Sequence, residues 1–250
     1  MTSVSGKRTL NRTRMLAFFD GLAATPTNGA LTLYLPPGTL SNELDKFLKD
    51  IPEPPEVLAE ISKIAGSSRT GAVIFRSPER TLAVLPPFPI AERQISLLIE
   101  TQPLRSIIEQ ERRIALVLVR LGSYAVGVCD GEKLVGSKVG TGLVHGRHRQ
   151  GGSSAHRFER HRDKQIEYFL TRVCRRSREH IEPYVKSLDY VVYGGARTTI
   201  QLLKKQCPFI GRLETPALPP LYDIPEPRQA VLEDAVKHVW SSTVYEWRES

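Results

Sequence analysis

The sequence predicts an α/β protein built on a mixed β-sheet with flanking helices. Strand-like and helix-like patterns alternate along most of the chain. In its second half, three consecutive strand patterns precede a loop, a long amphipathic helix, a further strand and a further helix. The 250 residues, 40% apolar and 25% charged, have the composition of a soluble globular protein that buries a core. We predict an N-terminal α/β region over residues 1–110 and a second domain over residues 111–250.

Helix and strand patterns follow one another through residues 1–110. The expected elements are a helix from Lys7 to Ala24, a strand from Leu31 to Leu35, a helix that Ser41 caps and prolines interrupt before it continues through Ile64, a hairpin of Gly71–Phe75 and Thr81–Leu85, and a short helix at Pro103–Gln110. This region shows no motif with evident chemistry.

The second domain begins with an antiparallel meander, because short turn signals separate three strand patterns. The expected elements are strands at Ile114–Leu121, Tyr124–Cys129 and Lys133–Val139, a helix from Ser153 or Ser154 to about Ile181, a strand at Tyr190–Tyr193, a helix at Ala196–Gln206 and a last amphipathic helix from Glu226 towards Trp247. The glycines at 136–142 and at 194–195 are interpreted as turns, since no phosphate-loop signature accompanies them.

A glycine loop at residues 145–154 lies between the meander and the long helix. Residues 145–164 contain the pair Gly151-Gly152, four of the six histidines and six Lys or Arg. Adjacent glycines let a backbone approach a surface closely, and guanidinium groups suit a dense array of phosphates. The segment therefore predicts an RNA partner.

The charge pattern supports the same interpretation. The formal net charge is +8, and residues 145–180 hold ten Lys or Arg against four acids. Concentrated positive charge is typical of a surface that binds a polyanion. No signal peptide is evident, and the longest apolar run, Ile114–Val119, is too short to span a bilayer. We therefore expect a cytoplasmic protein with no membrane contact.

The long helix has two chemically different faces. One face, at helical spacing, is apolar and is predicted to pack on the sheet; it consists of Ala155, Phe158, Ile166, Phe169 and Val173. Phe158 and Phe169 are expected in the core, as are Tyr190 and Trp240 outside this helix. The basic residues lie almost opposite, where they would face phosphate. The predicted RNA-binding residues are His145, Arg147, His148, Arg149, His156, Arg157, Arg160, Lys164, Arg175 and Arg178.

The three cysteines, Cys129, Cys174 and Cys207, are far apart and lack metal-type spacing, which predicts buried thiols in a reducing compartment. The histidines of residues 145–161 lack a cysteine or carboxylate framework, so we expect no metal site and no cofactor. One of these histidines as a general base is an alternative with a suitable intrinsic pKa, but no pattern holds it against a nucleophile.

The stretch from Lys138 to Arg162 resembles the central domain of eukaryotic and archaeal peptide-chain release factors. There a Gly-Gly-Gln loop precedes a helix that begins Ser-Ala-x-Arg-Phe-x-Arg-x-Arg, and this chain has Ser-Ala-His-Arg-Phe-Glu-Arg-His-Arg at 154–162. The stretch is closer still to the Vms-like release factors of ribosome quality control, including bacterial members. The resemblance extends from about Arg112 to Gly211.

This resemblance implies an RNase H-like α/β domain and a peptidyl-tRNA hydrolase that acts on stalled ribosomes or released large subunits. The implied partners are peptidyl-tRNA and the peptidyl transferase centre of the large ribosomal subunit. A monomer is the default for a factor that must enter a ribosomal cavity. Because no codon-reading domain is evident, recognition of a stop codon is not expected.

The chain departs from the family pattern at the catalytic position. Ser153 follows Gly-Gly where release factors place glutamine, and the nearest glutamine, Gln150, precedes the glycines. The predicted catalytic residues are Gln150, Gly151, Gly152 and Ser153. The glycine N–H groups would donate to a developing oxyanion, while Gln150 or Ser153 orients a water.

Two other functions compete with hydrolysis. A factor that fills the ribosomal A site without cleaving anything fits the missing glutamine. A nuclease fits the implied fold, but metal-dependent nucleases need converging carboxylates, and residues 140–156 contain none.

Overall fold

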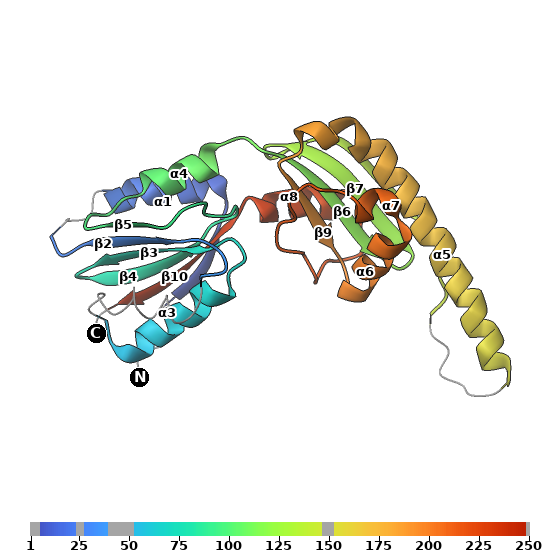
Figure 1. The fold of residues 1–250 in the computed structure, drawn as a ribbon, viewed down its shortest axis with the longest axis horizontal. Helices are drawn as coiled ribbons and strands as arrows, with labels where there is room; N and C mark the ends of the chain where they lie inside the picture. Colours follow the sequence, from blue (N-terminus) through green and yellow to red (C-terminus); the bar gives the residue numbers. More distant parts are fainter. Residues whose placement is uncertain (1–5, 24–27, 40–52, 147–152, 249–250) are drawn as a thin grey trace. The chain divides into compact units, whose positions relative to one another are not determined.

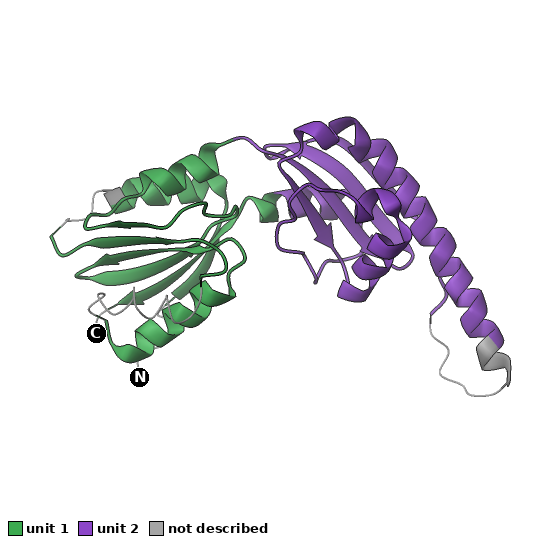
Figure 2. Cartoon of the chain, in the orientation of Figure 1, with its two compact units in different colours: residues 1–110, 237–250 green, residues 111–236 purple. Residues whose placement is uncertain are grey.

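The chain divides into two compact units, which Figure 2 shows in two colours. The computed structural model describes residues 6–23, 28–39, 53–146 and 153–248, with the backbone alone for residues 23 and 153–156. Unit 1 comprises residues 1–110 and 237–250, and unit 2 comprises residues 111–236. Within the described ranges, no helix has both the length and the apolar character that crossing a membrane requires.

Unit 1 is an antiparallel six-stranded sheet in the order β1-β10-β4-β3-β2-β5, with helices on both faces (Figure 1). Its elements are β1 (Gly6–Leu10), α1 (Arg12–Ala23), β2 (Leu31–Leu35), α3 (Pro55–Ser67), β3 (Ala72–Ser77), β4 (Arg80–Leu85), β5 (Gln94–Ser96), α4 (Gln102–Glu109) and β10 (Ser242–Arg248). Because side chains alternate along a strand, Tyr34 packs with α1 and α4, whereas Leu33 and Leu35 pack with α3. Both faces of this sheet are therefore buried.

Most of the expected elements of this region are present. The strand at 31–35, the hairpin of β3 and β4 and the short helix α4 are confirmed. The helix expected from Lys7 begins at Arg12 instead, because residues 6–10 form β1 and pair with β10. Ser41 and the start of the second expected helix lie outside the described residues, and α3 begins at Pro55.

Unit 2 is a four-stranded mixed sheet in the order β8-β7-β6-β9, in which β9 is parallel to β6 and the other pairs are antiparallel. Its elements are β6 (Arg113–Arg120), β7 (Ser123–Asp130), β8 (Lys133–Thr141), α5 (Ser153–Ile181), a 3-10 helix η1 (Glu182–Ser187), β9 (Tyr190–Gly194), α6 (Arg197–Gln206), α7 (Pro208–Gly211) and α8 (Gln229–Val239), whose last residues belong to unit 1. The mixed α/β fold and the order of strands and helices are as the sequence predicts.

One sheet face of unit 2 forms a core with α5, α6 and α7. Val117 and Val126 of the sheet meet Phe169 and Val173 of α5 and Leu203 of α6, all fully or almost fully buried. Burying an apolar side chain of this size contributes about 1.5–3 kcal/mol. The packing therefore fixes the second half of α5 on the sheet.

The end of the chain corrects two expectations. The last helix does not run towards Trp247: α8 ends at Val239, and residues 242–248 form β10 between β1 and β4. Residues 237–250 therefore belong to unit 1, whereas the sequence predicts that they form the end of a second domain over residues 111–250. The reason is that β10 pairs with strands far away in the sequence, and its residues Val244 and Trp247 are buried on the two faces of the N-terminal sheet.

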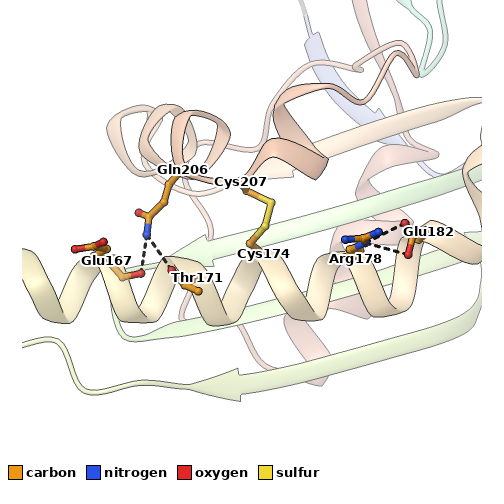
Figure 3. Close-up of a disulfide and its surroundings, with 7 residues drawn as sticks. All are labelled: Glu167, Thr171, Cys174, Arg178, Glu182, Gln206 and Cys207. Carbon is orange, nitrogen blue, oxygen red and sulfur yellow. Dashed lines mark hydrogen bonds and ion pairs between the residues drawn. A yellow bond between two sulfur atoms is a disulfide. The ribbon is translucent and has the colours of Figure 1, made fainter.

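The cysteine prediction is wrong for two of the three residues. Cys174 of α5 and Cys207, which follows α6, form a disulfide with Cα atoms 5.3 Å apart (Figure 3). The two helices pack together and bring these distant positions into contact. Cys129 is a buried thiol, as expected, and burial raises its pKa to about 12.

Candidate nucleic-acid interface

Helix α5 extends beyond the sheet that supports it (Figure 1). It has 29 residues, which corresponds to a length of about 44 Å. From Phe169 onwards one face is buried, whereas residues 157–168 have no buried side chain. We call residues 157–168 the distal half and residues 169–181 the packed half.

The chain leaving β8 runs alongside the distal half and is held there by side chains of α5. The N–H of His145 donates to Gln165 Oε1 at 3.1 Å, and Arg162 Nε donates to the carbonyl of His145 at 3.0 Å. Lower on the helix, Arg172 Nη1 donates to the carbonyl of Thr141 at 2.8 Å. Residues 141–145 are therefore fixed against α5 at both ends.

A glycine makes this close approach possible. A Cβ atom built on Gly142 would lie 2.8 Å from Cδ2 of Phe169, closer than real side chains approach. The N–H of Gly142 donates to the carbonyl of Gly122 at 2.9 Å, so the turn after β6 fixes the same point. Gly142 is a packing residue, and Gly136 and Gly140 lie inside β8, so the interpretation of the glycines at 136–142 as turns is wrong.

Beside His145, the distal half forms a hollow of about 560 Å³. Its lining combines imidazole, guanidinium and carboxamide groups with a phenyl ring. It consists of His145, Gly146, Arg157, Phe158, His161, Arg162 and Gln165. Arg157, His161 and Gln165 follow one another at four-residue intervals and so share one side of the helix. The hollow thus joins two predicted RNA-binding residues, His145 and Arg157.

Phe158 corrects a prediction. The sequence places it on the apolar face with Phe169, yet its side chain is 57% exposed while Phe169 is 3% exposed. Both residues are at positions that helical spacing puts on one face. Phe158, however, belongs to the part of α5 that extends beyond the edge of the sheet, so no strand covers it. Phe158 contributes an apolar surface to the hollow instead of to the core.

The predicted basic face is present, with a difference between its two ends. Arg157, Arg160 and Lys164 in the distal half are exposed, as is His145. In the packed half, Arg175 pairs with Glu179 at 3.8 Å, and Arg178 donates to Glu182 at 3.0 Å. The chain's own acids therefore partly neutralise the two predicted residues nearest the end of α5.

Arg176 adds a third ion pair to the packed half. Its Nη1 donates to Glu179 Oε2 at 2.6 Å. This hydrogen bond lowers the pKa of Glu179 below its usual range and raises the pKa of Arg176. Glu179 thus faces two arginines, which concentrates the compensation of charge at one point of the helix.

The remaining predicted site residues have no described side chain. Arg147, His148, Arg149, Gln150, Gly151 and Gly152 lie outside the described residues. Ser153 and His156 belong to the first turn of α5, of which the backbone is described. In the described part of the chain, no group of three or more His, Cys, Asp or Glu is arranged to hold a metal ion.

Sequence reasoning missed the residues that position the site. Arg162 and Gln165 hold His145, and Arg172 holds Thr141. Arg162 belongs to the Arg-x-Arg pattern of the resemblance, but no sequence signal indicates that it bonds a backbone carbonyl.

A mixed α/β unit in which a long basic helix follows the glycine loop in sequence is what the resemblance to release factors implies. The family model described as Actinobacteria/chloroflexi VLRF1 release factor matches residues 112–245, more than half of the chain, and the chain belongs to this family. The resemblance to release factors is therefore confirmed.

Two curated relatives are similar over part of the chain. Peptide chain release factor subunit 1 of Archaeoglobus fulgidus is 27% identical over 156 residues, which cover 61% of this chain and 37% of the relative. The protein of the same name from Thermococcus sibiricus is 27% identical over 124 residues, which cover 48% and 30%. The chain spans about a third of the length of these relatives.

Solved structures resemble the chain more distantly. The crystal structure of an archaeal translation termination factor, aRF1, has a TM-score of 0.41 at 18% identity and covers 92% of this chain and 70% of its own. A second archaeal protein has a TM-score of 0.37 at 17% identity and covers 90% of this chain and 69% of its own.

Proposed function

We propose that this protein is a peptidyl-tRNA hydrolase that binds the ribosome and releases nascent chains from stalled ribosomes or large subunits. The observation that carries the proposal is the family match over residues 112–245, which contain both the glycine loop and α5. Its partners would be the large subunit at the peptidyl transferase centre and peptidyl-tRNA. Such a factor works in the cytoplasm, where translation takes place, and we expect it to act as a monomer.

The distal half of α5 supports the RNA-binding part of the proposal. Arg157, Arg160 and Lys164 are exposed on a helix segment that the sheet does not cover. Contacts of such side chains are made mostly to phosphates and weaken with salt. His145 and Arg157 line one hollow beside the glycine loop and would bind RNA there together.

The positioning of the loop supports the catalytic part. An ester needs only a correctly placed water to be hydrolysed, so proximity and orientation supply much of the acceleration. Residues 147–152 join Gly146 to α5, and the preceding residue, His145, is hydrogen-bonded to α5 through both its N–H and its carbonyl. This attachment would present the loop to the ester in a defined place. We assign oxyanion stabilisation to the N–H groups of Gly151 and Gly152 and orientation of the water to Gln150, with Ser153 as the alternative.

Incubation with ribosome-bound peptidyl-tRNA tests the proposal. A gel that resolves free peptide, intact tRNA and shortened tRNA should show free peptide together with intact tRNA. Gln150→Ala should reduce peptide release without reducing co-sedimentation with ribosomes, and Gln201→Ala, on an exposed face of α6, should change neither. Shortened tRNA would contradict the hydrolase proposal, and unchanged release by Gln150→Ala would move the role to Ser153.

A second function is favoured by one specific observation, the serine at position 153 where release factors have glutamine. On that basis the protein would occupy the ribosomal A site without cleaving the ester. The same experiment separates the two functions, because a non-catalytic factor would co-sediment with ribosomes and release no peptide.

A further inference from the structure

Tyr168 is an unexpectedly exposed aromatic residue in the distal half of α5. Its side chain is 74% exposed, although the next residue, Phe169, is 3% exposed. The Tyr168 hydroxyl has no hydrogen-bond partner among the described residues. Within the described part of unit 2, the ring therefore serves neither the core nor a polar contact.

The neighbours of Tyr168 on the helix surface are mostly basic. Arg160, Lys164, Tyr168 and Arg172 follow one another at intervals of four residues, so they lie on the same side of the helix. All four side chains are exposed. The ring is thus bracketed by an ammonium and a guanidinium group.

The backbone beneath Tyr168 is firmly held. Gln206 Nε2 donates to the carbonyl of Glu167 at 2.7 Å and to Thr171 Oγ1 at 3.1 Å, as Figure 3 shows. About one helical turn further along α5, the Cys174–Cys207 disulfide joins this helix to the residue that follows α6. An exposed ring on a fixed backbone loses little conformational entropy when a flat ligand stacks on it.

Arg172 is also fixed beside the ring. One of its Nη atoms donates to the carbonyl of Thr141, which leaves other N–H groups of a planar cation near Tyr168. On the opposite side, Lys164 makes no ion pair with a described acid. Phosphates on either side of a stacked base would find a cation within reach.

We propose that Tyr168 is a binding site for an unpaired nucleobase of ribosomal RNA, with Lys164 and Arg172 as contacts to the flanking phosphates. Aromatic rings interleaved with cations bind unpaired bases by stacking and their phosphates by charge. A protein partner fits less well, because the residues one helical turn before and after the ring, Lys164 and Arg172, are exposed cations, and charged residues are depleted in the centre of protein interfaces. The inference rests on the proposed function in that α5 must reach the ribosome.

Binding of the 250-residue chain to purified large ribosomal subunits that carry peptidyl-tRNA tests this site. Tyr168→Leu should weaken binding about tenfold, because stacking is lost while the charge is unchanged. Tyr168→Phe keeps the ring and should retain wild-type affinity. Tyr222→Leu is the matched control, since Tyr222 is 52% exposed in unit 2 outside α5, and it should bind normally. Unchanged thermal unfolding of Tyr168→Leu would exclude misfolding.

The salt dependence distinguishes stacking from a general effect on the basic face. Lys164→Gln should lower the slope of log affinity against log salt by about one, whereas Tyr168→Leu should leave the slope unchanged. A benzophenone amino acid incorporated at position 168 should cross-link to ribosomal RNA. Wild-type binding by Tyr168→Leu, or cross-links confined to ribosomal protein, would overturn the site.

This test separates the site from the proposed function. If the wild type released no peptide but Tyr168→Leu still bound about tenfold more weakly, the nucleobase site would stand and the hydrolase would not. If the wild type released peptide and Tyr168→Leu bound as tightly as the wild type, the hydrolase would stand and the nucleobase site would not.

Discussion

The two halves of α5 have the same helical backbone and a similar supply of arginines, but their surroundings differ. In the packed half, Phe169, Leu170 and Val173 are buried against the sheet. There Glu179 and Glu182 also bind arginines of the same helix. In the distal half no side chain is fully buried: Ile166 packs at the edge of the core, Gln206 of α6 holds the carbonyl of Glu167, and Arg162 and Gln165 hold His145.

The comparison shows how one helix serves two purposes. A helical segment of a dozen residues is marginal in water by itself. The distal half persists because the packed half nucleates it and because the chain entering the glycine loop is bonded along it. Stability is therefore concentrated in the packed half, while Arg157 and Lys164 of the distal half are exposed.

Two adjacent residues at the junction should differ most in their effect on stability. We expect Phe169→Ala to lower the free energy of unfolding by about 3–5 kcal/mol, since it removes a buried ring and leaves a cavity. Tyr168→Ala should change it by no more than about 0.5 kcal/mol, because its ring is exposed. Urea denaturation measures both values, and equal losses would contradict the division of α5 into two halves.

The disulfide gives the next largest effect. Replacing Cys174 and Cys207 by serine should cost about 2–4 kcal/mol, because the cross-link between positions 33 residues apart restricts the unfolded chain. A thiol reductant should lower the thermal midpoint of the wild type by a comparable amount. The double variant should not respond to reductant, and a wild type equally insensitive to it would show that the bond contributes nothing in solution.

Loss of the bonds to His145 should loosen the distal half alone. Arg162→Ala and Gln165→Ala each remove one hydrogen bond, worth about 1 kcal/mol. Amide hydrogen exchange should accelerate in residues 153–165 while global unfolding stays unchanged. Since alanine has the highest helix propensity, faster exchange would reflect the lost bond. Lys164→Ala, which touches neither His145 bond, is the control and should not accelerate exchange.

The smallest effect concerns the acid side of the stability profile. The hydrogen bond from Arg176 lowers the pKa of Glu179 below its ordinary value of 4.5, so the folded state favours the carboxylate. The contribution of this ion pair to stability is complete above the pKa that Glu179 has in the unfolded chain. It disappears as the pH falls through the lower pKa of Glu179 in the folded protein. Glu179→Gln should therefore flatten the fall of the thermal midpoint at acid pH, by a small amount because the pair is exposed. If the thermal midpoint of Glu179→Gln fell at acid pH as steeply as that of the wild type, the Arg176–Glu179 pair would contribute nothing to stability.

Local patterns predicted the parts of the fold that local interactions determine. The bounds of α5 and of the strands at 113–141 agree with periodicity and turn residues, and the glycine loop with its Ser-Ala-x-Arg-Phe sequel indicated the family. Pairing over long distances was not predictable in this way. The residues around Val244 carry no local signal that they pair with β1 and β4. The residues around Cys174 likewise carry no signal that Cys207 packs against it.

The candidate site divides in the same manner. Residue types and spacing predicted the exposed cations Arg157, Arg160 and Lys164. They failed at Phe158, because a helical repeat does not tell where the supporting sheet ends. They also missed Arg162 and Gln165, whose partner is backbone that no side-chain pattern marks.

Strand β10 has a consequence for synthesis and for fragment design. Unit 1 is interrupted in sequence by the whole of unit 2, so its sheet cannot close until residues 242–248 have left the ribosome. A fragment of residues 1–110 would lack the partner of both β1 and β4 and expose a strand edge prone to aggregation. Residues 111–236 are contiguous, and we expect them to complete their own core earlier during translation.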